Sequence, residues 1–110
     1  MSIDTQVARD VEGYLVDPDD WNEQIARALA AAEGLELTDE YWAIIGFMRA
    51  YREQHKVIPD VRHVVGFMVD TRGYDKKAAK KRLFKLFPYG YVKQACKIAG
   101  MQRPRAWSTG

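Results

Sequence analysis

The sequence predicts a mainly α-helical protein, built as a small orthogonal helical bundle with a short β-hairpin at its N-terminus. Apolar residues recur at helical spacing through most of the chain, and several of these stretches follow an acidic or hydroxyl residue and stop near a glycine. With 110 residues, 47% of them hydrophobic, the composition is that of one globular domain covering residues 1–110. We divide it into a hairpin or arm (1–16), a helical body (17–100) and a C-terminal arm (101–110).

The first elements are set by turn and capping signals. Residues 3–16 contain Gly13 and are too short for a firm helix, so we expect a loose hairpin or extended arm. Acidic residues beside Pro18 favour a helix start, and we expect the first helix from about Asp19 to Ala32, ended by Gly34. Its apolar face is formed by Trp21, Ile25 and Leu29.

The second and third helices supply most of the expected core. Thr38 is a candidate N-cap for a helix to about Gln54, and its wide apolar stripe favours the central position in the bundle. Pro59 fits the first turn of a third helix, which ends at Thr71-Arg72-Gly73. The inward-facing residues of this third helix are expected to be Val61, Val64, Val65 and Met68.

Two further helices complete the body. Asp75 should cap a fourth helix through about Leu86, and a short fifth helix should run from Val92 to Ala99 before Gly100 ends it. The fourth helix is expected to turn its apolar residues inward and its lysines outward. Its inward residues would be Ala78, Leu83, Phe84 and Leu86.

Composition excludes several classes of protein. No apolar run approaches the ~18 residues that span a bilayer, and residues 1–15 lack the pattern of a secretory signal. We therefore expect a cytoplasmic monomer that does not associate with membranes. The single cysteine, Cys96, excludes an intramolecular disulfide and a cysteine-rich metal site. His55 and His63 lack ligands at metal-binding spacing, so we expect neither a metal nor a cofactor.

Charge is divided unevenly along the chain. Residues 1–71 hold 6 Lys or Arg against 14 Asp or Glu, a net charge of −8, whereas residues 72–110 hold 11 against 1, a net charge of +10. One interpretation is a nucleic-acid-binding regulator that uses a helix-turn-helix-like region at 59–86. Its candidate phosphate-binding residues are Arg72, Lys76, Lys77, Lys80, Lys81 and Arg82. A solvated basic helix face is the alternative.

A second interpretation comes from a resemblance to a known family. The run Leu86-Phe87-Pro88-Tyr89-Gly90, then Lys93-Gln94-Ala95-Cys96, Ala99-Gly100 and Arg103-Pro104 resembles the C-terminal signature of the DsrC/TusE family. Upstream residues also fall in the family's order: Glu12-Gly13-Tyr14-Leu15, Trp21, Leu37-Thr38, Trp42, Phe47, Arg49, Tyr51, Pro59 and Arg62. The resemblance covers nearly the whole chain. It implies a mainly α fold with a helix-turn-helix-like core and a flexible C-terminal arm.

The resemblance also implies a function. Members of this family are partners in sulfur relays rather than independent enzymes, and they carry sulfur as a persulfide on a cysteine near the C-terminus. Cys96 matches an earlier cysteine found in DsrC-type members, whereas Trp107 stands where the terminal cysteine is expected, and Tyr91 stands where a proline is common. The implied partners are sulfurtransferases or sulfite-reductase-type proteins, with DNA or tRNA-modifying machinery as further candidates.

Candidate site residues follow from the two interpretations together. Cys96 is the candidate sulfur carrier, and Lys93 and Lys97 beside it would favour a thiolate if they lower its pKa. A buried, inert thiol is the alternative, in which case the protein would modulate the relay without carrying sulfur. The candidate partner-binding residues are Lys93, Arg103, Pro104, Arg105 and Trp107.

Overall fold

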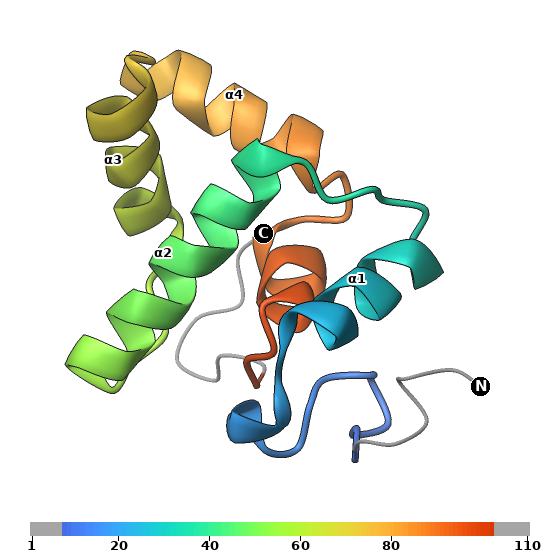
Figure 1. Cartoon of the computed structure of the whole chain (residues 1–110). Helices are drawn as coiled ribbons and strands as arrows, with labels where there is room; N and C mark the ends of the chain where they lie inside the picture. The colour runs from blue at the N-terminus through green and yellow to red at the C-terminus, as the bar shows by residue number, and fades with distance from the viewer. Residues whose placement is uncertain (1–7, 103–110) are drawn as a thin grey trace.

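The computed structural model describes residues 8–102 and contains helices joined by short loops (Figure 1). No strand occurs within this range, so the mainly α prediction is confirmed. None of these helices is both long and apolar enough to cross a membrane. The elements are the 3-10 helix η2 (Pro18–Asp20), α1 (Glu23–Ala32), α2 (Asp39–His55), α3 (Val61–Arg72), α4 (Lys76–Leu86) and the π-helix η3 (Tyr91–Cys96). The helix continues from η3 through residues 97–98, and we call this whole segment the last helix.

The predicted N-terminal hairpin is not seen among residues 8–16. A single antiparallel bridge joins Arg9 to Leu15. Between them the chain turns tightly at Gly13, and the carboxylate of Asp10 accepts a hydrogen bond from the backbone N–H of Tyr14 at 3.0 Å. Two backbone hydrogen bonds flank the bridge, from the N–H of Asp10 to the carbonyl of Tyr14 at 2.8 Å and from the N–H of Val16 to the carbonyl of Ala8 at 3.0 Å, but no strand forms among residues 8–16. The turn buries Tyr14 and Leu15 against the helical body.

The first α-helix starts later than expected. Residues Pro18–Asp20 form the short helix η2, and Trp21 then takes an extended conformation. Asn22 caps α1 by accepting a hydrogen bond from the backbone N–H of Ile25 at 2.9 Å. The acidic run therefore begins a separate turn, and the polar side chain after Trp21 begins the helix.

The middle helices agree more closely with the sequence. Asp75 caps α4 through the N–H of Ala78, as expected. Thr38 stands at the N-cap of α2, but its side chain makes no capping bond. Pro59 precedes α3 rather than lying in its first turn, because Asp60 takes the capping position.

The predicted inward face of α4 is wrong at one residue. Ala78 is exposed, and Ala79 is buried in its place. Ala79, Leu83 and Leu86 follow the i, i+4, i+7 spacing of one helix face, which turns the intervening lysines to the surface.

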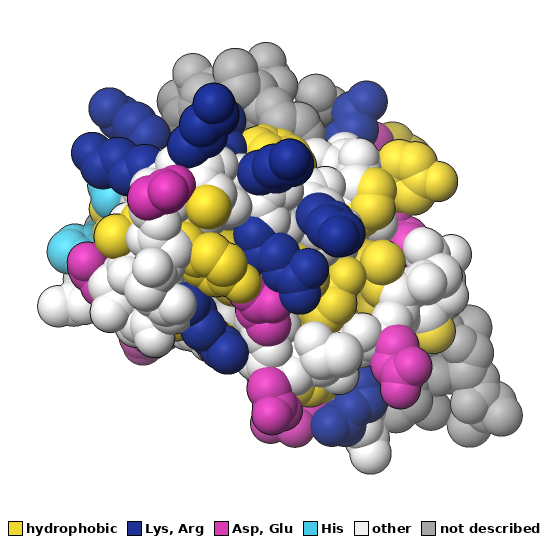
Figure 2. Space-filling model, turned by 90° about the horizontal axis from the view of Figure 1, so that it is seen from above, with side chains coloured by type: hydrophobic (Ala, Val, Ile, Leu, Met, Phe, Trp, Pro, Cys, Tyr) yellow, Lys and Arg dark blue, Asp and Glu magenta, His cyan; other side chains and the backbone are white. Residues whose placement is uncertain are grey.

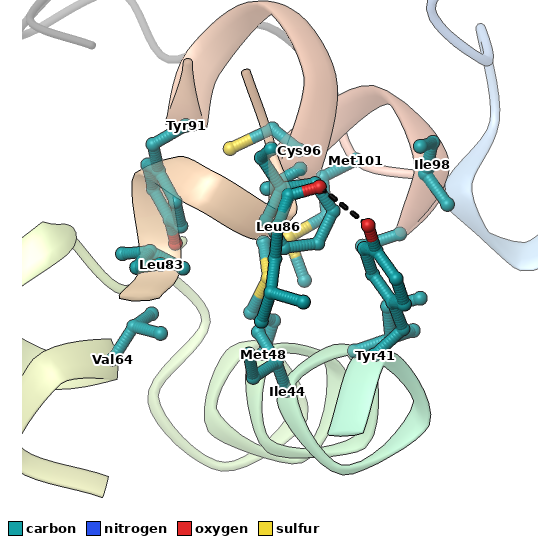
Figure 3. Close-up of a cluster of buried hydrophobic side chains, with 14 of the residues drawn as sticks. Tyr41, Ile44, Met48, Val64, Leu83, Leu86, Tyr91, Cys96, Ile98 and Met101 are labelled. Atoms are coloured by element: carbon teal, nitrogen blue, oxygen red, sulfur yellow. Dashed lines mark hydrogen bonds between the residues drawn. The ribbon is translucent and has the colours of Figure 1, made fainter. Parts of the chain in front are cut away.

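Helix α2 lies in the middle of the molecule, with α3 and α4 on one side and α1 and the last helix on the other (Figure 1). Figure 3 shows the buried side chains at this centre, where α2, α3, α4 and the C-terminal segment meet. The hydroxyl of Tyr41 donates to the backbone carbonyl of Leu86 at 2.6 Å and so ties α2 to the end of α4. Buried residues at this meeting point include Tyr41, Ile44, Met48, Val64, Leu83, Leu86, Tyr91, Ile98 and Met101.

Candidate functional site

The side chains of Arg49 and Trp21 hold the end of the last helix in place through hydrogen bonds to its backbone carbonyls. Arg49 of α2 donates to the carbonyl oxygen of Ala99 at 2.6 Å and to that of Pro18 at 3.1 Å. Its guanidinium also lies 4.1 Å from the centre of the Trp21 ring. The Trp21 indole N–H donates to the carbonyl oxygen of Ile98 at 2.9 Å. We call Trp21, Arg49 and Gly100 the arm-base clamp, because they hold the end of the last helix where the C-terminal arm begins.

Gly100 gives the clamp its shape. Its φ of +76° lies in the left-handed region, which favours glycine. The N–H of Met101 donates to the carbonyl oxygen of Cys96 at 3.0 Å, which completes a Schellman ending of the helix. Side chain and backbone contacts therefore fix the direction in which the chain leaves the body.

The clamp could not be read from helical periodicity alone. Arg49 stands in the apolar stripe of α2 beside Ile45 and Met48, both of which are buried. Burial lowers the pKa of Arg49, although a guanidinium remains charged at neutral pH. A cation at that position requires partners, and the carbonyl oxygens at the end of another helix are suitable ones. In the sequence, the one sign of this contact was that Arg49 is a charged residue within the apolar stripe of α2.

Only one of the predicted partner-binding residues, Lys93, lies within the described residues 8–102. Lys93 is exposed on the last helix. Gln102 donates from its side-chain amide to the carbonyl oxygen of Val16 at 2.8 Å, which anchors the last described residue to the N-terminal loop. Arg103, Pro104, Arg105 and Trp107 lie outside the described residues, so their roles remain predictions.

Cys96 is in the protein interior. Its exposed fraction is 0%, and burial raises the pKa of its thiol to about 12, although a hydrogen bond with Tyr91 acts in the opposite direction. The expectation that two lysines lower this pKa is wrong. Lys93 points to solvent, and the ammonium of Lys97 lies over the Tyr14 ring, 5.2 Å from its centre. At neutral pH the thiol is therefore protonated and enclosed.

Tyr91 accounts for part of this enclosure. Its side chain is fully buried, and its hydroxyl donates a hydrogen bond to the backbone carbonyl of Pro59, just before α3. Burial raises the pKa of this phenol well above its ordinary value, and the neighbouring Cys96 adds to the effect. The tyrosine thus joins the start of the last helix to the start of α3, with the thiol beside it (Figure 3).

The basic residues of the nucleic-acid interpretation are only partly free. Figure 2 shows a gathering of Lys and Arg on the face seen from above. Arg82, however, bonds Glu40 through two nitrogens at 2.8 and 3.0 Å, and Tyr74 donates to the same carboxylate at 2.9 Å. Arg82 is therefore not free to bind a phosphate, contrary to the nucleic-acid interpretation. The remaining candidates are exposed, namely Arg72, Lys76, Lys77, Lys80 and Lys81.

Both histidines contact neighbouring side chains of the protein. His63 pairs with Asp60 in the capping box of α3, with 2.9 Å between its Nδ1 and a carboxylate oxygen. His55 packs against the Tyr51 ring. Within residues 8–102 no three His, Cys, Asp or Glu side chains lie together as a metal site would need.

Comparison with known proteins gives a consistent result. Residues 2–106 match the family described as DsrC like protein. The chain is 40% identical over 100 residues to the sulfurtransferase TusE of Sodalis glossinidius, covering 91% of this chain and 92% of the relative. It is also 40% identical over 99 residues to the TusE homologue of Haemophilus influenzae, covering 90% of each.

Solved structures show the same relationship. The oxidised gamma subunit of dissimilatory sulfite reductase (DsrC) from Archaeoglobus fulgidus superposes with a TM-score of 0.80 at 35% identity, covering 90% of both chains. DsrC of Allochromatium vinosum gives a TM-score of 0.77 at 40% identity, covering 90% of this chain and 88% of that one. The fold and the sequence therefore point to the same relatives.

Proposed function

The chain belongs to the DsrC-like family, and on that premise we propose that it is a sulfur-relay protein that docks on relay partners without carrying sulfur on Cys96. Its TusE and DsrC relatives support the relay role. These relatives give no support to the nucleic-acid alternative. The docking partner we propose is a sulfurtransferase or a sulfite-reductase-type protein.

The burial of Cys96 is the observation that carries this proposal. A sulfur carrier needs a thiolate that can attack a sulfane sulfur and then present the persulfide to an acceptor. The chain has one cysteine, and its thiol is 0% exposed with its pKa raised to about 12. Neither requirement is met while the protein is folded, so the chain acts by binding.

The arm-base clamp supports the docking part of the proposal. Arg49, Trp21 and Gly100 fix where the C-terminal arm begins, which lowers the entropy that a partner must remove when it binds the arm. The arm carries Arg103 and Arg105 around Pro104, followed by Trp107 in the place of the family's terminal cysteine. An indole can anchor a protein in an apolar pocket. Lys93, exposed on the last helix, is the remaining residue that we propose for partner binding.

Titration calorimetry against a purified sulfurtransferase that serves a TusE relative tests the proposal. We expect the full chain to bind, and Trp107→Ala to weaken binding by roughly 10-fold or more, because a buried indole anchor contributes at least ~1.4 kcal/mol. Ser108→Ala, one residue along the same arm, is the matched control and should bind like the unaltered chain. Equal binding by the Trp107 variant would refute the anchor, and no binding by any form would refute docking on this partner.

A further inference from the structure

A groove lies between α3 and α4, away from the arm-base clamp. Its volume is about 340 Å³, and it is lined by Val61, Arg62, Val65, Gly66, Lys76 and Lys80. Figure 2, which views the molecule from above, shows apolar side chains between Lys and Arg side chains. The groove therefore combines apolar lining residues from α3 with cationic ones from both helices.

The cations at the groove are not neutralised by the chain itself. Lys76 and Lys80 are exposed and take part in no ion pair among residues 8–102. Arg62 pairs with Asp60 at 3.2 Å, but its side chain is 89% exposed, and surface pairs of this kind are weak. The groove thus presents positive charge that would complement an acidic ligand.

Gly66 keeps the groove open. It lies inside α3, where glycine costs about 1 kcal/mol relative to alanine. A Cβ added there would meet no heavy atom within 4 Å, so packing inside the described chain does not require a glycine. A side chain at this position would project into free space and would narrow the space between α3 and α4.

We propose that the α3–α4 groove binds an acidic amphipathic helix of a partner protein. The apolar side of such a helix would cover the half-buried Val61 and the 9% of Val65 that stays exposed, and its carboxylates would meet Lys76 and Lys80. A helical ligand fits better than nucleic acid, because a phosphate backbone has no apolar face to cover the valines. This surface goes beyond the docking at the C-terminal arm, from which it differs in both elements and residues.

The probe is a synthetic helical peptide with leucines along one face and glutamates along the other. We expect it to shift the amide NMR signals of residues 61–66 and 76–80 in the full chain, with little change near Gly100. The same peptide with lysine in place of glutamate should not produce these shifts. No shifts, equal shifts with the lysine peptide, or shifts with a DNA duplex in place of the acidic peptide would overturn the proposal.

Two glycines provide a matched pair of variants. Gly66→Leu should weaken peptide binding at least 10-fold by filling the groove, whereas Gly46→Leu, also in a helix interior with nothing within 4 Å of its Cβ, should leave binding unchanged. A cooperative thermal unfolding transition in each variant is the control that both are folded. Lys80→Glu should weaken binding more than Lys80→Gln, because reversal adds repulsion to the lost attraction. Equal binding by the Gly66 variant and the unaltered chain would refute the site.

Discussion

A Cβ atom on Gly100 would lie 2.3 Å from Cδ1 of Trp21, closer than non-bonded atoms can approach. The end of the last helix is therefore packed against the indole with no space for a side chain. Because Trp21 also bonds the carbonyl oxygen of Ile98, the two contacts hold the base of the C-terminal arm in a single position. Both contacts can be tested by substitution.

We predict that Gly100→Ala destabilises the protein by about 2–4 kcal/mol, from left-handed backbone strain combined with overpacking against Trp21. Gly34→Ala separates the two effects, because Gly34 has a similar φ of +77° but nothing within 4 Å of its Cβ. The Gly34 variant should lose only about 1 kcal/mol. Urea unfolding measures both losses. Equal losses would mean that the contact with Trp21 contributes nothing.

Arg49→Lys should loosen the end of the last helix although it keeps the charge. A lysine cannot reproduce the planar fork that bonds both Ala99 and Pro18 or the stacking on Trp21, so we expect a loss of about 1–3 kcal/mol. Amide hydrogen exchange should accelerate at Gly100 and Met101. Arg52→Lys, on the same helix and without a hydrogen bond or ion pair from its side chain among residues 8–102, is the control. Unchanged exchange in the Arg49 variant would show that Arg49 does not hold the end of the last helix.

Glu40 links the acidic and basic parts of the chain. Desolvation disfavours its charged form, but hydrogen bonds from Arg82 and Tyr74 outweigh that cost and lower the pKa of the carboxyl. Its contribution is therefore present above the ordinary pKa of 4.5 and is lost as pH falls through the lower folded value. We expect Glu40→Gln to cost about 1 kcal/mol at pH 7, since Arg82 is partly exposed to screening.

The pH dependence distinguishes this ion pair from a simple packing effect. The stability difference between Glu40→Gln and the unaltered chain should shrink as pH is lowered below 4.5. Glu36→Gln, at an exposed position with no hydrogen bond or ion pair among residues 8–102, should cost little at any pH. A Glu40 difference that does not change with pH would show that the charge is not responsible.

Cys96 should make the protein sensitive to alkali. Burial raises the pKa of the thiol from its ordinary value of 9.0 to about 12, so between these pH values the unfolded state has released a proton that the folded state retains. Stability should then fall as pH rises, on the order of 1 kcal/mol per pH unit from this group. Cys96→Ala should show a shallower decline between pH 9 and 10, below the range where Tyr91 also contributes. Parallel declines would mean that the thiol is not enclosed.

The sequence predicted those elements whose signals are local. Asp75 predicted the start of α4 and Gly100 the end of the last helix, because a capping carboxylate and a left-handed glycine act within one turn. The predicted start of α1 was wrong, because Pro18–Asp20 has the signals of a helix start but forms a separate 3-10 turn. The last helix begins as a π-helix, which periodicity does not distinguish from an α-helix.

The candidate site depended on contacts between distant residues. Nothing near Arg49 in sequence indicates that its guanidinium meets Ala99, fifty residues away. Similarly, Lys93 and Lys97 flank Cys96 in sequence, but burial rather than their charge determines the pKa of the thiol. The family resemblance identified the fold and the relay, and the comparisons confirm that membership. The single-domain division and the roles of the arm residues stay predictions.

We propose that this protein takes part in the relay without carrying sulfur on Cys96. Intact-mass spectrometry after incubation with a persulfidated sulfurtransferase tests this proposal, with the sulfurtransferase TusE of Sodalis glossinidius as the positive control. We predict no gain of about 32 Da on this chain while the relative gains one sulfur, and alkylation of Cys96 only after unfolding. A reducible gain that disappears in Cys96→Ala would contradict the claim and make this protein a single-thiol carrier.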